Sequence, residues 1–191
     1  MEPTNKPKRL NNVNVFTLTK TAIMTAVICA LGPISVPIPL SPVPITLGIV
    51  GILLSVYVLG WKLGTLSVCI YLLLGAFGVP VFSGFSGGFA KIIGPTGGYL
   101  AGFVFLALIS GLFIERFSEK KFIQFFGIML GIAVCYLLGT VWLKIQANMT
   151  FLGALTAGTL PYIPFDAAKA VICIFAGNKL KNLNEKFRQS E

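Results

Sequence analysis

Histidine is absent from the 191-residue chain, and charged residues make up only 11% of it. Soluble domains carry about 25% charged residues, so fewer than half of the usual number are present. Without histidine, metal sites that depend on imidazole are excluded, as are Ser–His and Cys–His catalysis. The phosphate-binding loop G-x-x-x-x-G-K-[ST] is also missing, so we expect no ATP site in this chain. The sequence thus predicts neither an ATPase nor a catalytic centre.

Cysteine is used sparingly and never in pairs. Each of the four cysteines lies alone within an apolar run, and none belongs to a C-x-x-C motif. Isolated cysteines of this kind behave as small buried hydrophobes. We therefore predict no metal site and no cofactor. The four positions are Cys29, Cys69, Cys135 and Cys173.

Apolar residues, by contrast, are abundant: 55% of the chain is hydrophobic and a further 21 residues are glycine. Soluble domains reach only about 45–50% even when glycine is included. Residues 21–61 carry no charge at all, and a bilayer core is crossed by about 20 helical residues. The chain is therefore predicted to be an integral membrane protein whose partner is the lipid bilayer.

The charge-free stretches and the prolines between them divide the chain into spans. Five prolines fall within residues 33–44, and proline cannot continue a helix because it lacks a hydrogen-bond donor. Residues 21–61 therefore hold parts of two spans with a turn between them. Applied to the whole chain, this reasoning predicts an all-α membrane protein with six transmembrane helices, at residues 16–31, 45–60, 63–78, 97–114, 122–143 and 161–177.

Basic residues indicate the orientation. An even number of spans places both termini on one side, and 12 of the 15 basic residues then lie on that side. The other side has only Lys91, Lys144 and Lys169. By the positive-inside rule the termini are cytoplasmic, and residues 1–14 form a cytoplasmic tail of a single membrane domain, residues 1–191. The basic surplus is thus a topology signal in a multi-pass cell-membrane protein, and no nucleic-acid partner is predicted.

Three connections fall on the outer side, at about residues 32–44, 79–98 and 146–161. All three are long, apolar and poor in charge, whereas loops in water normally carry charges. Irregular backbone at membrane depth is tolerated where it is buried in protein or lines a cavity. We expect these loops to roof an outward-facing binding cavity; the alternative is that they are merely compact hydrophobic loops.

One acidic residue lies apart from the others. Asp166 falls near the outer end of the last span, three residues before Lys169, so both share one face of a helix. A charge within a span is costly, which makes such a residue a candidate for function; a structural ion pair is the alternative. The pair suits a small ligand with a carboxylate and N–H groups, and Lys91 is a second candidate for the anion. Candidate apolar walls are Phe82, Phe85, Phe89, Tyr99, Tyr162 and Phe165.

The first span carries Ala22, Ala26 and Ala30 at intervals of four residues. Small residues at this spacing form a stripe on which another helix can pack closely. The stripe indicates either packing within the protein or docking of a second membrane subunit.

Three segments together resemble one protein family. They are LSPVPITL at residues 40–47, then GVPVF at 78–82 continuing to GPTGGYLAGF at 94–103, and PYIPFDAAK at 161–169. The sequence is similar to the BioY family, the biotin-specific substrate-binding (S) components of energy-coupling factor (ECF) transporters. The resemblance implies a six-helix S component that captures biotin from outside. It also implies a transmembrane coupling (T) subunit, which would dock on the alanine stripe, and two cytoplasmic ATPases, which would use ATP.

The resemblance implies that particular residues of this sequence bind biotin. Asp166 and Lys169 are the main polar candidates, and Thr46, Gly87, Gly88, Thr96 and Tyr99 are further candidates. Gly48 stands where family members commonly have Gln, so no ligand contact is assigned there. Two other functions stay open: a solitary biotin or small-anion facilitator without ATPase partners, and a small intramembrane enzyme. General acid–base chemistry usually needs two tuned groups, so a single outer carboxylate argues against the enzyme.

Overall fold

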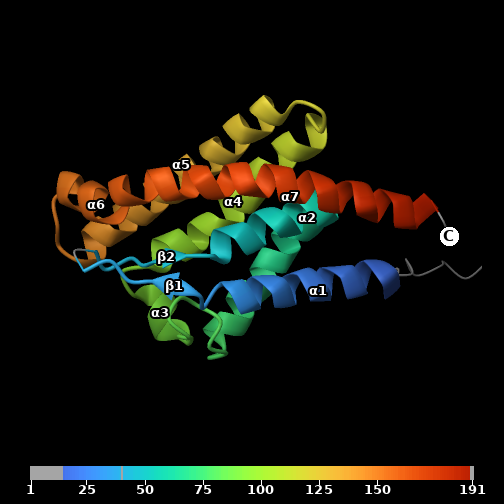
Figure 1. Ribbon diagram of the computed structural model, residues 1–191. Coiled ribbons are helices and arrows are strands. Elements are labelled where there is room, and N and C mark those ends of the chain that lie inside the picture. The colour runs from blue at the N-terminus through green and yellow to red at the C-terminus, as the bar shows by residue number, and fades with distance from the viewer. Residues whose placement is uncertain (1–14, 40, 190–191) are drawn as a thin grey trace, which may run out of the picture.

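The computed structural model describes residues 15–39 and 41–189, with side chains up to residue 181. The predicted cytoplasmic tail, residues 1–14, lies outside the described residues. Long helices run side by side along the molecule, and the start of α1 and the end of α7 lie at the same end (Figure 1). The elements are α1 (Val15–Leu31), β1 (Ser35–Val36), β2 (Ile45–Thr46), α2 (Gly48–Ala76), α3 (Phe89–Ile93), α4 (Gly97–Arg116), α5 (Lys121–Gln146), α6 (Phe151–Gly158), a 3-10 turn η1 (Leu160–Tyr162) and α7 (Ile163–Gln189).

Helix α2 contains two of the predicted spans, joined by a sharp bend at Gly60. Gly60 has φ 78° and ψ 176°, a conformation essentially confined to glycine. A Cβ on Gly64 would lie 2.9 Å from the Cα of Val56, whereas residues eight apart in a straight helix are separated by about 12 Å. The two halves of α2 therefore fold back on each other, and counting them separately confirms six helical segments.

The helices have the length and composition of membrane spans. Among the described residues, Gly48–Ala76, Gly97–Arg116, Lys121–Gln146 and Phe151–Lys181 are long and apolar enough to cross a bilayer, and Val15–Leu31 is a shorter apolar helix. The predicted second span begins too early, because Ile45 and Thr46 pair with β1 and the helix starts at Gly48. The all-α, multi-pass architecture is confirmed.

The three outer connections have more regular structure than the sequence indicated. The first holds the β1–β2 pair, in which Ser35 faces Thr46. The second contains α3 and an isolated bridge between Phe82 and Ser86. The third was expected to be irregular, and this is wrong for residues 151–158, which form α6 with Thr150 as a capping residue.

Helix α4 lies at the centre of the bundle and packs on α2 and α5. Close approach to α5 requires glycine: a Cβ on Gly139 would lie 2.2 Å from the Tyr99 ring, and one on Gly98 would lie 2.3 Å from Cβ of Trp142. The α4–α5 contact thus places Tyr99 firmly at the outer end of the bundle. All four cysteines are free; Cys135 and Cys173 are buried, and Cys29 and Cys69 are half-buried.

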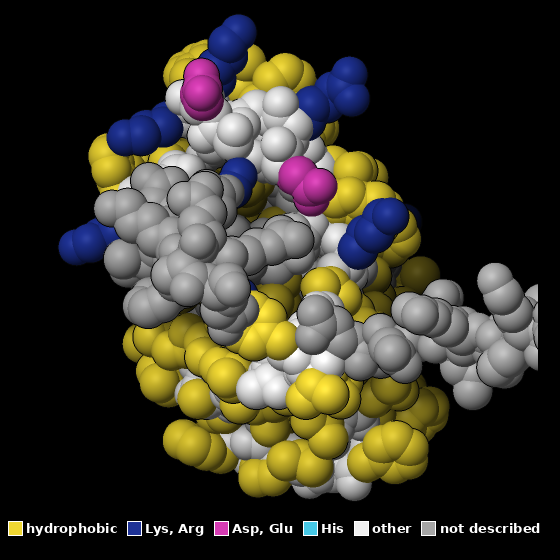
Figure 2. Space-filling model, turned by 90° about the vertical axis from the view of Figure 1, so that its right-hand side faces the viewer, with side chains coloured by type: hydrophobic (Ala, Val, Ile, Leu, Met, Phe, Trp, Pro, Cys, Tyr) yellow, Lys and Arg dark blue, Asp and Glu magenta, His cyan; other side chains and the backbone are white. Residues whose placement is uncertain are grey.

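Charge gathers at the end where the described chain begins and ends. Figure 2 looks onto this end, where dark-blue Lys and Arg side chains and magenta acidic side chains gather on the upper part. The lower part of the same view is largely yellow, that is, hydrophobic. This distribution is typical of a membrane protein whose charged end lies in water.

Candidate functional site

Two adjacent pockets, called the two lobes of the cavity below, lie beneath the outer connections. The lobes share walls formed by Val43, Pro44, Thr46, Tyr99 and Phe103. The first lobe is completed by Gly32, Tyr71, Phe82, Ser83, Lys91, Thr96 and Leu100. The second is completed by Ile45, Ile49, Cys135, Tyr136, Gly158, Tyr162, Asp166 and Lys169. The cavity therefore draws on all three outer connections and on α2, α4, α5 and α7.

The second lobe contains a hydrogen-bonded group of polar side chains. Asp166 lies in the first turn of α7, and its Oδ1 accepts from Nζ of Lys169 at 2.8 Å. Its Oδ2 accepts from the hydroxyl of Tyr136 on α5 at 2.5 Å. Nζ of Lys169 also donates to the backbone carbonyl of Thr46 at 2.7 Å. The side chains of Asp166 and Lys169 are 4% and 12% exposed, so this ion pair is almost fully enclosed.

Tyr162 ties the proline segment to the start of α7. Its hydroxyl donates to the backbone carbonyl of Val43 and also hydrogen-bonds the hydroxyl of Ser41, at 2.6 Å. Ser41 in turn accepts from the backbone N–H of Val43 at 3.1 Å. Val43 and Pro44 are thereby fixed as the wall common to both lobes.

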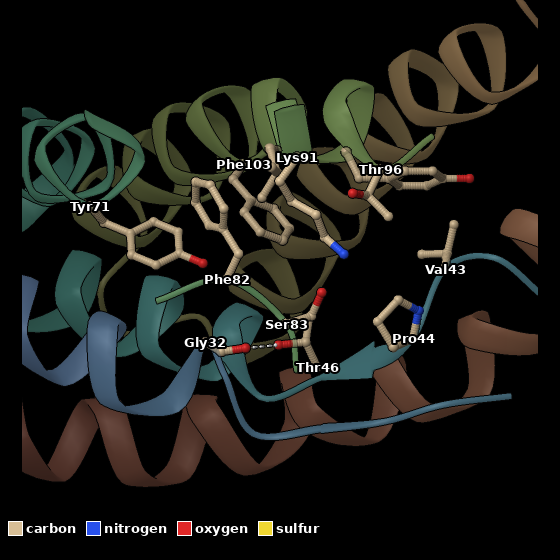
Figure 3. Close-up of a pocket in the computed structure, with 12 residues that line it drawn as sticks. Gly32, Val43, Pro44, Thr46, Tyr71, Phe82, Ser83, Lys91, Thr96 and Phe103 are labelled. Carbon is tan, nitrogen blue, oxygen red and sulfur yellow. Dashed lines mark hydrogen bonds between the residues drawn. The ribbon is translucent and has the colours of Figure 1, made fainter. Parts of the chain in front are cut away.

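The first lobe has a different polar group, centred on Lys91. Figure 3 shows the Lys91 side chain reaching from α3 into the cavity, toward Ser83 and the wall formed by Thr46. Within the part of the chain that the structure describes, Lys91 forms no ion pair. Its positive charge therefore lies unneutralised in a mostly apolar lobe, where an anion would be stabilised.

Trp142 holds the segment that carries Lys91. Its indole Nε1 donates to the carbonyl of Gly94 at 2.9 Å. A Cβ on Gly97 would lie 1.7 Å from the carbonyl oxygen of Ile92, so the chain doubles back tightly here before α4 begins. The indole and this tight turn together set the position of α3 over the cavity.

The structure brings together most of the candidate residues named from sequence. Asp166, Lys169, Lys91, Thr46, Thr96 and Tyr99 all line the cavity. The Thr46 hydroxyl is occupied, since it donates to the carbonyl of Gly32 and accepts from the N–H of Gly48, and the Tyr99 hydroxyl donates to the carbonyl of Gly158. Their contributions to the cavity are therefore mainly the Thr46 carbonyl and the Tyr99 ring.

Gly87 and Gly88 are not among the residues that line either lobe. The N–H of Gly88 donates to the carbonyl of Gly75 at 2.7 Å, and Gly87 packs against the backbone of Val79. Both glycines hold the second connection to the end of α2.

Of the six aromatic candidates, Phe82, Tyr99 and Tyr162 line the cavity. Phe85, Phe89 and Phe165 are 72%, 65% and 52% exposed and line neither lobe. Sequence reasoning missed Tyr136, Phe103 and Ser83. Tyr136 and Asp166 are separated by thirty residues, and nothing in the local sequence signals that pairing.

The alanine stripe lies on a separate surface. Ala22, Ala26 and Ala30 are all exposed on α1. Ala22 and Ala26 line an apolar groove with a volume of about 440 Å³, whose other wall includes Ile70, Leu74 and Val79. Because the three alanines face outward, the stripe does not pack within the described part of this chain.

Chemically, the cavity suits a small ligand with two polar ends and an apolar middle. An ion pair with a tyrosine lies in one lobe, a lone ammonium group lies in the other, and the shared wall is apolar. No cluster of His, Cys, Asp or Glu side chains that could hold a metal ion occurs among the described residues. The arrangement therefore favours ligand binding.

Comparisons with known proteins agree with this fold. The profile of the BioY family matches residues 5–186. The chain is 41% identical to the biotin transporter BioY of Thermotoga maritima over 166 residues, which cover 87% of this chain and 96% of that protein. It is 36% identical to the biotin transporter BioY of Lactococcus lactis subsp. cremoris over 177 residues, 90% and 93% of the two chains. A crystal structure of the S-component for biotin from an ECF-type ABC transporter superimposes with a TM-score of 0.82 at 35% identity, covering 90% of this chain and 94% of that chain.

Proposed function

Because the chain belongs to the BioY family, we propose that it is the biotin-binding S component of an ATP-driven vitamin uptake transporter. It captures biotin from the outer side and releases it toward the cytoplasm together with coupling subunits. The relatives described as biotin transporters and the likeness to a biotin S-component support the ligand. The observation that carries the proposal is the two-lobed cavity, with an enclosed ion pair in one lobe and Lys91 in the other.

The chemistry of biotin matches the two lobes. Biotin has a ureido ring with two N–H groups and one carbonyl, an apolar body, and a valerate carboxylate. A carboxylate offers about four acceptor sites, of which Asp166 uses two, for Lys169 and Tyr136. An ammonium has three donors, of which Lys169 uses two, for Asp166 and Thr46. Asp166 thus retains acceptor sites for the ureido N–H groups, and Lys169 retains a donor for the ureido carbonyl.

The valerate carboxylate then lies in the first lobe. Lys91 supplies the opposite charge there, and the shared wall of Val43, Pro44 and Phe103 accommodates the apolar body between the two ends. A ligand that has only a ureido ring or only a carboxylate leaves the polar side chains of one lobe without a partner. This orientation gives Asp166 and Lys169 a direct role in binding beyond that of a structural ion pair.

The lobes are narrow. The volume that the centre of a water molecule can occupy is only about 40–50 Å³ in each lobe, so each has room for a few waters. Biotin therefore binds only if the surrounding connections shift outward and then close on it. The connections that shift carry Lys91, Ser83 and Val43, so binding and loop movement are linked in this proposal.

Energy for release comes from other polypeptides in this proposal. The described residues and the sequence offer no phosphate-binding loop, and the exposed alanine stripe with its groove is the proposed contact for a transmembrane coupling (T) subunit. Two cytoplasmic ATPases complete the transporter. The termini and the basic end of Figure 2 face the cytoplasm, in agreement with the positive-inside rule.

Calorimetric titration of the purified chain with biotin tests the ligand. We expect one biotin per chain with a Kd in the nanomolar range and no heat from thiamine or riboflavin, which lack the ureido and valerate groups. If well-folded protein does not bind biotin, or binds all three vitamins alike, the proposed ligand is wrong.

A further inference from the structure

The hydroxyl of Thr96 is buried without a partner. Thr96 is 8% exposed, its Oγ1 is closed off from solvent, and among the described side chains it is the buried oxygen for which no hydrogen bond is found. A buried polar group without a partner lowers stability, because it has lost its hydrogen bonds to water. Such a group in a binding cavity points to a partner that arrives with the ligand.

The backbone explains why this hydroxyl stays free. Thr96 immediately precedes α4, where threonine normally accepts a hydrogen bond from the first turn while its backbone is extended. Thr96 instead has φ −89° and ψ −4° and forms no such bond. Thr150, in the same position before α6, has φ −66° and ψ 154° and accepts from the N–H of Gly153 at 3.1 Å. The local backbone conformation thus prevents the Thr96 hydroxyl from capping α4.

The surroundings of Thr96 favour a negative charge. Thr96 lines the first lobe, on the side where the Lys91 side chain enters (Figure 3), and its hydroxyl is covered there until the connections shift to admit biotin. Helix α4 begins at the next residue and has 20 residues, so the positive end of its dipole faces the same lobe. Thr46 and Ser83, from the first and second outer connections, line the same lobe as Thr96 and Lys91. The carboxylate at this end would therefore lie between an ammonium group, a hydroxyl and a helix N-terminus.

We propose that Thr96 is a specificity-determining residue whose hydroxyl donates a hydrogen bond to the ligand's carboxylate, next to Lys91. This inference rests on the proposed function, because it takes biotin as the ligand. Thr96 thereby selects ligands that retain a free carboxylate over esters of the same body. The hydrogen bond exists only in the complex, so its loss affects binding while the fold is unaffected.

The experiment compares Thr96→Val and Thr96→Ser with the parent chain by calorimetric titration with biotin and biotin methyl ester. Thr96→Val keeps the shape and removes the hydroxyl, and we expect its biotin Kd to rise at least tenfold while that for the ester rises less than threefold. Thr96→Ser keeps the hydroxyl, and we expect its Kd values for biotin and for the methyl ester to stay within threefold of those of the parent chain.

Thr65→Val is the matched control, because the Thr65 hydroxyl donates to the carbonyl of Trp61 near the bend in α2, away from the cavity.

Thermal unfolding of the ligand-free variants gives an independent readout. Valine places no unpaired polar atom in the site, so we expect ligand-free Thr96→Val to unfold at the same temperature as the parent or higher. A clear loss of stability would show that the hydroxyl has a partner within the protein and would overturn the inference. An unchanged biotin Kd, or equal losses for biotin and its ester, would overturn it as well. Failure of the parent chain itself to bind biotin would instead refute the proposed function.

Discussion

At the scale of single residues, the enclosed Asp166–Lys169 pair has two interpretations that make different predictions. Removing one member of a buried pair leaves the other charge uncompensated, which costs about 3–5 kcal/mol. Removing both members is often neutral for stability. A structural pair and a ligand-binding pair therefore differ in what the double replacement does to biotin binding.

We predict that Asp166→Asn and Lys169→Met each weaken biotin binding at least tenfold, about 1.4 kcal/mol, and lower the unfolding temperature. The combined variant Asp166→Asn/Lys169→Met should regain most of the stability, because no buried charge is left alone, and still bind biotin at least tenfold more weakly than the parent. Titration calorimetry and thermal unfolding on the same samples measure both. Recovery of binding along with stability in the double variant would mean that the pair is structural.

The sequence predicts this pair because two charges three residues apart stand out in an apolar span. It does not predict Tyr136, because the partner that orients the Asp166 carboxylate comes from another helix and is brought near only by the packing of α5 on α7. The free hydroxyl of Thr96 is equally hidden, since it depends on one backbone conformation before α4. Residue types can be read from sequence, whereas hydrogen-bond partners depend on packing.

At the scale of helices, α1 carries its small residues on an exposed face. Its alanines face outward, and Ala22 and Ala26 border a groove shared with α2 and the 79–81 segment. Helices in a bilayer associate through close packing at small residues, because lipid offers no hydrophobic driving force. An alanine stripe left open on the outside of a bundle therefore favours a second membrane protein as its partner.

We predict that Ala22→Leu together with Ala26→Leu abolishes co-purification with a coupling subunit and changes the biotin Kd less than threefold. The added side chains fill the groove but lie away from the lobes. Ala133→Leu is the matched control, since Ala133 is an exposed alanine on α5, outside the groove. Pull-down from membranes that contain the coupling subunit measures assembly. Assembly that survives the double replacement would exclude α1 as the docking face.

Helix positions follow from charge spacing, whereas the details of the outer connections do not. Gaps between charges and the proline segment located all six membrane segments, because a charge is expensive at the bilayer centre. The predicted spans place a turn between residues 60 and 63, in agreement with the bend at Gly60, although the positive φ of Gly60 becomes visible only in the structure. The pairing of β1 with β2 depends on contacts between connections, which no local pattern in this sequence encodes. Helix α6, by contrast, begins at the capping residue Thr150, a local signal that was missed.

At the scale of the whole molecule, the ends of the described chain lie at one basic end, opposite the cavity (Figures 1 and 2). We predict that this end is cytoplasmic. In a chain whose native cysteines are replaced by alanine, Lys144→Cys should react with an impermeant maleimide in intact cells, and Lys62→Cys only after the membrane is permeabilised. Both lysines are exposed, so access to the reagent depends on the side of the membrane. The opposite labelling pattern would contradict the orientation.

The hydrogen bond from Trp142 to Gly94 also gives the molecule an intrinsic optical signal. The chain has two tryptophans: Trp142 packs on Gly98 at the outer end of α4, and Trp61 packs on Gly111 of the same helix. Thirteen residues of helix separate the two by about 20 Å. Trp142 is bonded to the segment that must shift when the lobes fill, and Trp61 is remote from it. A change in indole emission when biotin is added should therefore come from Trp142 and report occupancy without any attached dye.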